Sequence, residues 1–352
     1  AFPELQNNNL TAPNTVILTL WSDAYKIIYR CNAVLEGLET SPISADVNKQ
    51  LKAEALFARA FCYFYLVNLF GDVPLVLSTN YVTNSNIGRS KVAAVYAKVI
   101  EDLNVARDFL PVDFSAFNGD RIRPVQATAN ALLSRIYLYK ENYTLAEQSA
   151  TLVIENSQFE LVEVSHTFLK NNKESILQVL PRFGSPFDQI VAQYGSTLRA
   201  GLLSIFSLED SRYSAWIRGN LCNKYKSDGD YSENSVVIRL AEIYLIRAEA
   251  RARQNQIAEG LEDLNVIRAK AGLSDLYIDN ESDLLSAILL ERRKEFFSEW
   301  GHRWLDLKRL NLGNSILAPL KEGWSESDLL YPIPQSQILS DPAMRDAQNP
   351  NY

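Results

Sequence analysis

The sequence predicts a mainly α-helical protein, in which helix pairs form a scaffold and a loop-rich half contains a few short strands. Three observations support this. Apolar residues recur at helical spacing along most of the chain, and the segments that show this spacing come in neighbouring pairs. Few segments alternate between apolar and polar residues with a period of two. Gly, Ser, Asn and Asp are frequent in one long segment, residues 156–237.

We expect the 352 residues to form a single domain. Its helical scaffold would occupy mainly residues 18–155 and 238–310, its loop-rich insertion residues 156–237, and a C-terminal loop region residues 311–352. The net charge of −7 and the isoelectric point near 5.1 disfavour a nucleic-acid-binding protein, which needs a basic face. We also expect that no apolar run is long enough to span a bilayer.

Three helices are predicted in the first third of the chain. A glycine lies at or just after the end of each of the first two helices. The third helix is expected to begin with a serine cap, and a proline follows its end. Their expected bounds are residues 18–38, 46–70 and 90–110.

Five more helices are predicted in the rest of the chain by the same periodicity. Their expected bounds are residues 124–140, 143–155, 238–254, 257–271 and 281–300. The best strand candidates are ESILQVLP at 174–181 and VVIR at 236–239, and both are short.

Two helix pairs resemble the tetratricopeptide repeat, in which small residues let two helices approach closely. Residues 126–155 fit this pattern well, with Ser134 at the first small position and Tyr137 at the aromatic one. Residues 240–273 fit it less well, because Arg251 stands where an aromatic residue is expected. We interpret both pairs as scaffold.

The search for catalytic and metal-binding residues finds little. The two histidines, His166 and His302, are far apart, and no nucleophile, phosphate-binding or zinc motif occurs. Glu291 and Glu295 alternate with basic residues and are interpreted as ion pairs along one helix. SDGDYSEN at 227–234 is interpreted as a solvated turn, with a calcium site as the alternative. The three cysteines form no CxxC pair and are expected to be buried thiols. We predict no catalytic residue, no metal and no cofactor.

Aromatic side chains beside amides are the main candidates for binding. A pyranose ring stacks its C–H face on an aromatic ring, while Asn, Asp and Arg bind its hydroxyl groups. For each aromatic residue the alternative is a structural role over the helical core. The candidate ligand-binding residues are Tyr81, Asn84, Asn86, Phe187, Tyr194, Arg199 and Trp216.

Seven segments, taken in this order, resemble the SusD/RagB-type nutrient-binding lipoproteins of Bacteroidota. The most distinctive are EALFARAFCYFYLVNLFGDVPLV (54–76), IRLAEIYLIRAEARARQNQIAEGLEDLNVIRAKAGL (238–273) and ERRKEFFSEWGHRWLDLKR (291–309). The others are residues 89–111, 127–147, 329–338 and 348–352.

The resemblance implies a binding protein and not an enzyme. Such proteins are lipidated on an N-terminal Cys, which we expect upstream of the given sequence in the full-length protein, and lie on the outer face of the outer membrane. They cap a SusC-like TonB-dependent transporter barrel, against which the tetratricopeptide-like helices pack. They deliver an oligosaccharide or, in the RagB branch, a peptide. In characterised members the loop after GDVPLV contributes to binding, which favours Tyr81, Asn84 and Asn86 here.

Two other functions remain as alternatives. A tetratricopeptide scaffold would bind protein tails in a concave groove. A helical glycosidase would need two carboxylates that are distant in sequence, and nothing in the sequence favours a particular pair.

Overall fold

The computed structural model describes residues 3–180, 197–226 and 232–352. The chain divides into two compact units. We call Pro111–Asp306 the central unit, and residues up to Leu110 together with Leu307–Tyr352 the terminal unit. The predicted helical scaffold contributes to both units.

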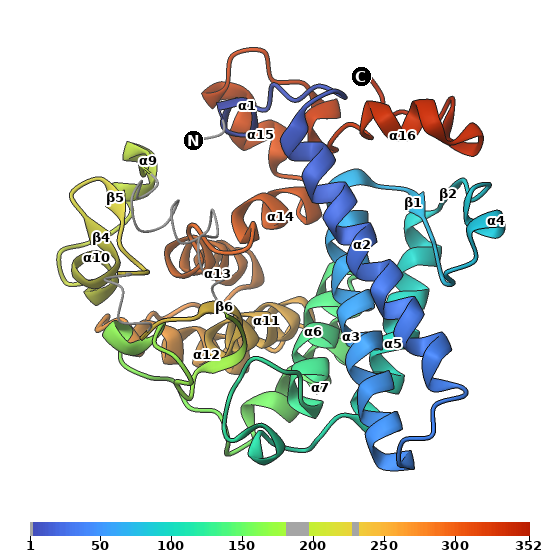
Figure 1. Ribbon diagram of the computed structural model, residues 1–352. Helices are drawn as coiled ribbons and strands as arrows, with labels where there is room; N and C mark the ends of the chain where they lie inside the picture. Colours follow the sequence, from blue (N-terminus) through green and yellow to red (C-terminus); the bar gives the residue numbers. More distant parts are fainter. Residues whose placement is uncertain (1–2, 181–196, 227–231) are drawn as a thin grey trace. The chain divides into compact units, whose positions relative to one another are not determined.

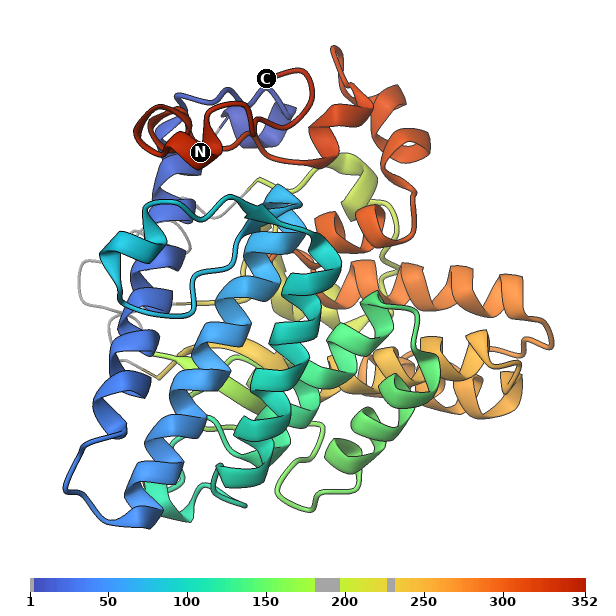
Figure 2. The ribbon, with the colours of Figure 1, turned by 90° about the vertical axis from the view of Figure 1, so that its right-hand side faces the viewer.

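Three long helices form the core of the terminal unit and run alongside one another (Figures 1 and 2). They are α2 (Thr15–Leu38), α3 (Ala45–Phe70) and α5 (Val92–Phe109), and α3 packs against both others. Trp21 of α2 meets Phe70 of α3 edge to face, with the ring centroids 4.9 Å apart. This aromatic pair lies close to the point where α3 ends.

Among the described residues, α3 is the one helix that length and composition would allow to cross a membrane. This corrects the expectation that no apolar run is long enough. Its most apolar window is 67% buried inside the protein. Buried helices of large cores are apolar on all sides, so the burial of α3 agrees with its place between α2 and α5.

The remaining elements of the terminal unit are short. The strands β1 and β2 pair antiparallel just after α3. These elements are α1 (Pro3–Asn7), β1 (Val73–Pro74), α4 (Tyr81–Asn84), β2 (Arg89–Ser90), α15 (Gly313–Leu317), η3 (Ala318–Leu320), η4 (Glu326–Leu329), α16 (Gln335–Ser340) and η5 (Pro342–Met344). The helix α14 (His302–Arg309) runs from the central unit into the terminal unit.

The central unit contains the two predicted helix pairs, and both are confirmed. They are α6 (Gln126–Tyr139) with α7 (Tyr143–Ile154), and α11 (Leu240–Arg253) with α12 (Ile257–Lys270). Gly260 shows why small residues are needed, since a Cβ there would lie 2.9 Å from the Ala248 carbonyl oxygen. α13 (Glu281–Glu295) packs on the second pair.

Arg251 stands where an aromatic residue was expected, and it forms ion pairs there. Its guanidinium lies 3.0 Å from Glu147 of α7 and 3.0 Å from Asp263 of α12. One side chain therefore joins the two helix pairs where ring packing was expected.

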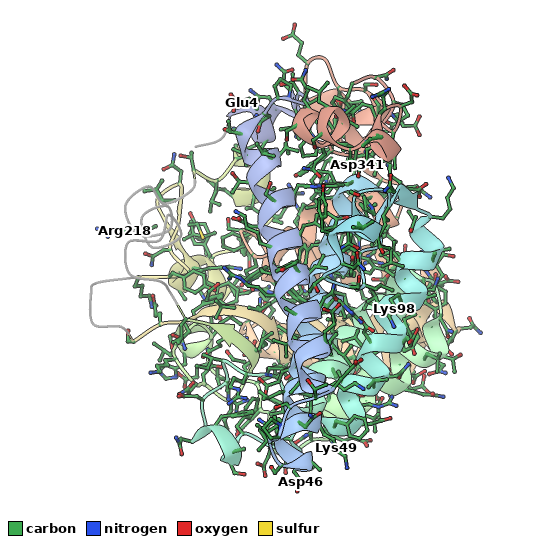
Figure 3. The ribbon with its side chains drawn as sticks, turned by 45° about the vertical axis from the view of Figure 1, so that its right-hand side comes forward. Glu4, Asp46, Lys49, Lys98, Arg218 and Asp341 are labelled. Atoms are coloured by element: carbon green, nitrogen blue, oxygen red, sulfur yellow. The ribbon has the colours of Figure 1, made fainter. Side chains whose placement is uncertain are left out.

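Both predicted strands are confirmed, and they pair with each other. β3 (Ser175–Val179) and β6 (Ser235–Arg239) are antiparallel, with irregular register near Leu177. β4 (Ile217–Arg218) and β5 (Leu221–Cys222) form a small hairpin, in which Arg218 is exposed (Figure 3). The other short elements of the unit are η1 (Ser115–Phe117), η2 (Val164–His166), α9 (Ala200–Leu203) and α10 (Ser211–Trp216).

Buried ion pairs connect the elements of the central unit. Arg239 of β6 donates to Glu295 of α13 at 2.6 Å and to Glu174 at 3.1 Å. Arg212 of α10 donates to Glu295 at 2.8 Å and forms an ion pair with Glu291. The prediction that Glu291 and Glu295 pair along their own helix is therefore wrong. They pair instead with buried arginines of other elements, each of which offers several hydrogen-bond donors.

Several helix bounds differ from prediction, and two of these differences have a local cause. Ser90 does not cap α5 but belongs to β2, and α5 follows Lys91 without a side-chain cap. The helix predicted for residues 281–300 ends at Glu295, and Trp300 has a left-handed φ of 37° in the turn before α14. The three cysteines are buried and free, as predicted.

Candidate functional site

The segment that follows GDVPLV presents an exposed aromatic ring. We call residues 75–87 the Tyr81 loop. Tyr81 opens the short helix α4, whose N-cap residue Asn80 accepts a hydrogen bond from the Thr83 backbone N–H at 3.1 Å. The Tyr81 side chain is 80% exposed, and Val82 beside it is 71% exposed. The described part of the protein therefore leaves the phenol ring of Tyr81 accessible.

The buried Tyr63 and the half-buried Tyr25 hold the backbone that leads into this loop. The Tyr63 hydroxyl accepts a hydrogen bond from the Val76 backbone N–H at 2.7 Å and donates to the Val76 carbonyl at 2.9 Å. The Tyr25 hydroxyl donates to the Pro74 carbonyl at 2.8 Å. Tyrosine hydroxyls are protonated donors at neutral pH, and burial raises the pKa of both further above the ordinary value of 10.0.

A carboxylate on α2 holds the loop from outside. The Thr79 backbone N–H donates to Glu36 Oε1 at 2.7 Å, and the Thr79 hydroxyl donates to Glu36 Oε2. These hydrogen bonds lower the pKa of Glu36, because they favour its charged form. The contact joins the loop to the last turns of α2.

Asn84 and Asn86 hold the loop in shape. The Asn84 amide donates to the Ser78 carbonyl at 2.8 Å, which closes the turn beneath α4. The Asn86 amide donates to the Val82 carbonyl at 3.3 Å and stays exposed. Asn86 is therefore the more accessible of the two for a ligand hydroxyl.

Trp216 is a core residue, which corrects its expected role in stacking on a ligand. It is 2% exposed, and its indole N–H donates to the Val164 carbonyl at 2.9 Å. The ring packs against Phe168 and Phe297, with centroids 5.5 and 6.4 Å away, and the Lys224 ammonium lies 4.6 Å from its centroid. These neighbours leave no ring face open for a sugar.

Three other residues of the insertion were predicted to bind ligand. Arg199 is the exposed N-cap residue of α9 in the central unit. Phe187 and Tyr194 lie outside the described residues, as does most of the segment 227–234.

A cavity of about 330 Å³ lies among the three long helices of the terminal unit. Lys98 of α5, labelled in Figure 3, belongs to its wall. The wall mixes both charges with aliphatic side chains: Leu35, Leu38, Glu39, Asn48, Lys52, Leu56, Arg59, Lys98, Glu101, Asp102 and Val105. It has no exposed aromatic ring, so a sugar would not find a stacking surface there.

One exposed aromatic residue, Tyr277, was not predicted from the sequence. It is 94% exposed, and the Asn265 side chain bonds both the N–H and the carbonyl of neighbouring Leu276, at 2.9 and 3.1 Å. Leu276 and Ile278 pack on the core of the central unit. The alternation of apolar and other residues across 276–278 was the available signal for an outward-facing ring.

Two family profiles match the chain. The profile described as "Starch-binding associating with outer membrane" matches residues 2–138, and the profile described as "SusD family" matches residues 206–352. The SusD-like protein P2 of Formosa agariphila is 26% identical, in an alignment that covers 99% of this chain and 83% of that protein. A SusD-like protein of Bacteroides ovatus is 24% identical, covering 87% and 68%.

Solved structures show the same fold. A laminarin-binding SusD-like protein has a TM-score of 0.84 at 25% identity, covering 99% of this chain and 88% of that chain. A SusD superfamily protein from Parabacteroides distasonis also has a TM-score of 0.84, at 21% identity, covering 100% and 89%. The chain belongs to the SusD/RagB-type family of binding proteins that associate with the outer membrane.

Proposed function

We propose that this protein captures an oligosaccharide at the cell surface, with Tyr81 as the ring on which a sugar stacks. The observation that carries the proposal is the 80% exposure of Tyr81 on a loop whose backbone, with that of Pro74 just before it, is held by partly buried hydrogen bonds. A fixed ring loses little conformational freedom when a ligand binds. Asn86 would bind ligand hydroxyl groups beside it.

The likeness to a laminarin-binding protein supports a glycan as the ligand class. Within the proposal, the glycan passes to a SusC-like TonB-dependent transporter barrel. The protein would be held on the outer face of the outer membrane by an N-terminal lipid on the full-length chain. The association of the family with the outer membrane supports this partner and place. Arg199, Phe187 and Tyr194 remain proposed contributors from the insertion.

Binding of the purified chain to a panel of polysaccharides tests the ligand class. The panel contains laminarin, starch and plant and host glycans, with pools of peptides as the competing class. We expect one glycan to retard the protein in affinity electrophoresis and to give a binding isotherm in calorimetry. Binding of peptides alone would show instead a function of the RagB kind.

Tyr81→Ala tests the site. We expect a loss of about tenfold in affinity for the bound glycan, since an aromatic stacking contact contributes on the order of 1 kcal/mol or more. Tyr81→Trp should keep binding. Tyr277→Ala is the matched control, because Tyr277 is as exposed but belongs to the central unit. Equal affinity of the Tyr81→Ala variant and the wild type would refute the site.

A further inference from the structure

One buried amide, that of Asn32 on α2, reaches the Tyr81 loop from the interior of the terminal unit. Its side-chain nitrogen donates to the Val76 carbonyl at 3.1 Å and to the Ser78 carbonyl at 3.5 Å. Its side-chain oxygen accepts a hydrogen bond from Arg59 of α3 at 2.8 Å. The Asn32 side chain is fully buried, and the loop residues Val76 and Ser78 that it contacts are half-buried.

Arg59 decides which way this amide points. A guanidinium only donates hydrogen bonds, so it can be met only by the oxygen of the Asn32 side chain. The NH2 group must then face the opposite direction, toward the two backbone carbonyls of the loop. In the flipped orientation donors would face Arg59, and the amide oxygen would face the carbonyl oxygens.

Arg59 is itself fixed by a carboxylate on α5. Its Nε and one terminal nitrogen donate to the two oxygens of Asp102, at 2.8 and 2.9 Å. Arg59 is 4% exposed and Asp102 is 2% exposed. Such two-pronged, charge-assisted pairs have one preferred geometry. Lys98 also lies 3.2 Å from Asp102, at the wall of the cavity.

We propose that Asn32 is a positioning residue for ligand binding at Tyr81, oriented by the Arg59–Asp102 pair. The proposal rests on the function proposed above. Without the two hydrogen bonds from Asn32, the backbone of residues 76–78 keeps its contacts with Tyr63 and Asn84 but varies more widely. A ligand that stacks on Tyr81 then has to order the loop as it binds, and this lowers its affinity.

Asn32→Asp separates orientation from packing. The carboxylate has nearly the same shape and keeps an acceptor for Arg59, but it turns an acceptor toward the Val76 and Ser78 carbonyls. We expect laminarin oligosaccharide, or the glycan identified in the panel, to bind roughly tenfold more weakly, as loss of two hydrogen bonds implies. We also expect faster amide hydrogen exchange in residues 75–87. Arg59→Lys keeps the charge but not the two-pronged pair, and it should show both effects in smaller measure.

The pair Arg135–Glu242 in the central unit provides a matched control. It is also two-pronged, with both contacts at 2.6 Å, and it is as deeply buried. Arg135→Lys should therefore lower stability much as Arg59→Lys does. It should leave glycan affinity and exchange in the Tyr81 loop unchanged.

Three results would overturn the proposal. The first is wild-type affinity and loop exchange in folded Asn32→Asp and Arg59→Lys proteins, while Tyr81→Ala loses binding. The second is an equal loss of affinity in Arg135→Lys, which would show a general effect of weakened folding. The third is unchanged exchange in the Tyr81 loop of Asn32→Asp. This result rejects the positioning role even where the wild type binds no glycan, an outcome that by itself refutes the proposed function.

Discussion

The Tyr81 loop and the segment around Trp216 each place an aromatic residue among polar residues, but different contacts hold the two segments. In the Tyr81 loop, hydrogen bonds from Tyr63, Tyr25 and Asn32 hold the backbone and leave the ring of Tyr81 outside. Around Trp216, the indole itself makes the contacts that hold the segment. An aromatic residue is available for a ligand when other groups fix its backbone, and it is unavailable when its own ring does so.

Trp216→Ala should give the largest effect on stability. Removal of a buried indole leaves a cavity, and we expect the free energy of unfolding to fall by about 3–5 kcal/mol. Tyr81→Ala should change it by less than about 0.5 kcal/mol, because the ring is exposed. Urea denaturation of both variants checks this. Similar losses in the two variants would remove the contrast between the regions.

Lys224, beside Trp216, should make the free energy of unfolding increase at alkaline pH. Burial lowers the pKa of Lys224 to about 8, against an ordinary value of 10.5. Between these values the unfolded chain binds more protons, so the free energy of unfolding should rise with pH. Relative to a Lys224→Met variant, we expect a gain on the order of 2 kcal/mol from pH 8 to 10.5. Parallel pH profiles of the two proteins would contradict the assignment.

Protonation of Glu36 should have the smallest effect of the three, and the effect should be confined to amide exchange in the Tyr81 loop. Its pKa is lowered by the Thr79 hydrogen bonds, so this anchor is present at neutral pH and is lost as pH falls below the ordinary range of Glu. Amide exchange in residues 75–87, corrected for its intrinsic pH dependence, should become faster at acid pH. Glu36→Gln should weaken this dependence, with no change around Trp216. A variant with the wild-type profile would show that Glu36 does not hold the loop.

The regular elements could be predicted because their signals are local. Helical spacing predicted α6, α7, α11 and α12, and alternation predicted β3 and β6. The role of Trp216 could not be predicted in this way, because its ring is covered by Phe168 and Phe297, which are remote in sequence. Polar neighbours along the chain suggested exposure, but tertiary contacts decided it.

The anchors of the candidate site gave a weaker signal that could have been used. Asn32 shares helical spacing with Trp21 and Ile28 and is the polar member of that buried face. A buried amide on an apolar face requires hydrogen-bond partners. The sequence indicates such a need, but only the fold supplies Arg59 and the carbonyls that satisfy it.

Arg251 has a consequence for the order of the helix pairs. A repeat whose neighbours meet through an aromatic ring can stack on many apolar surfaces. The α11–α12 pair meets α7 through Arg251, which needs the carboxylate of Glu147 opposite it and that of Asp263 beside it. Exchanging or duplicating this pair within the array would separate the cation from Glu147, so its position in the chain is fixed by charge as well as by shape.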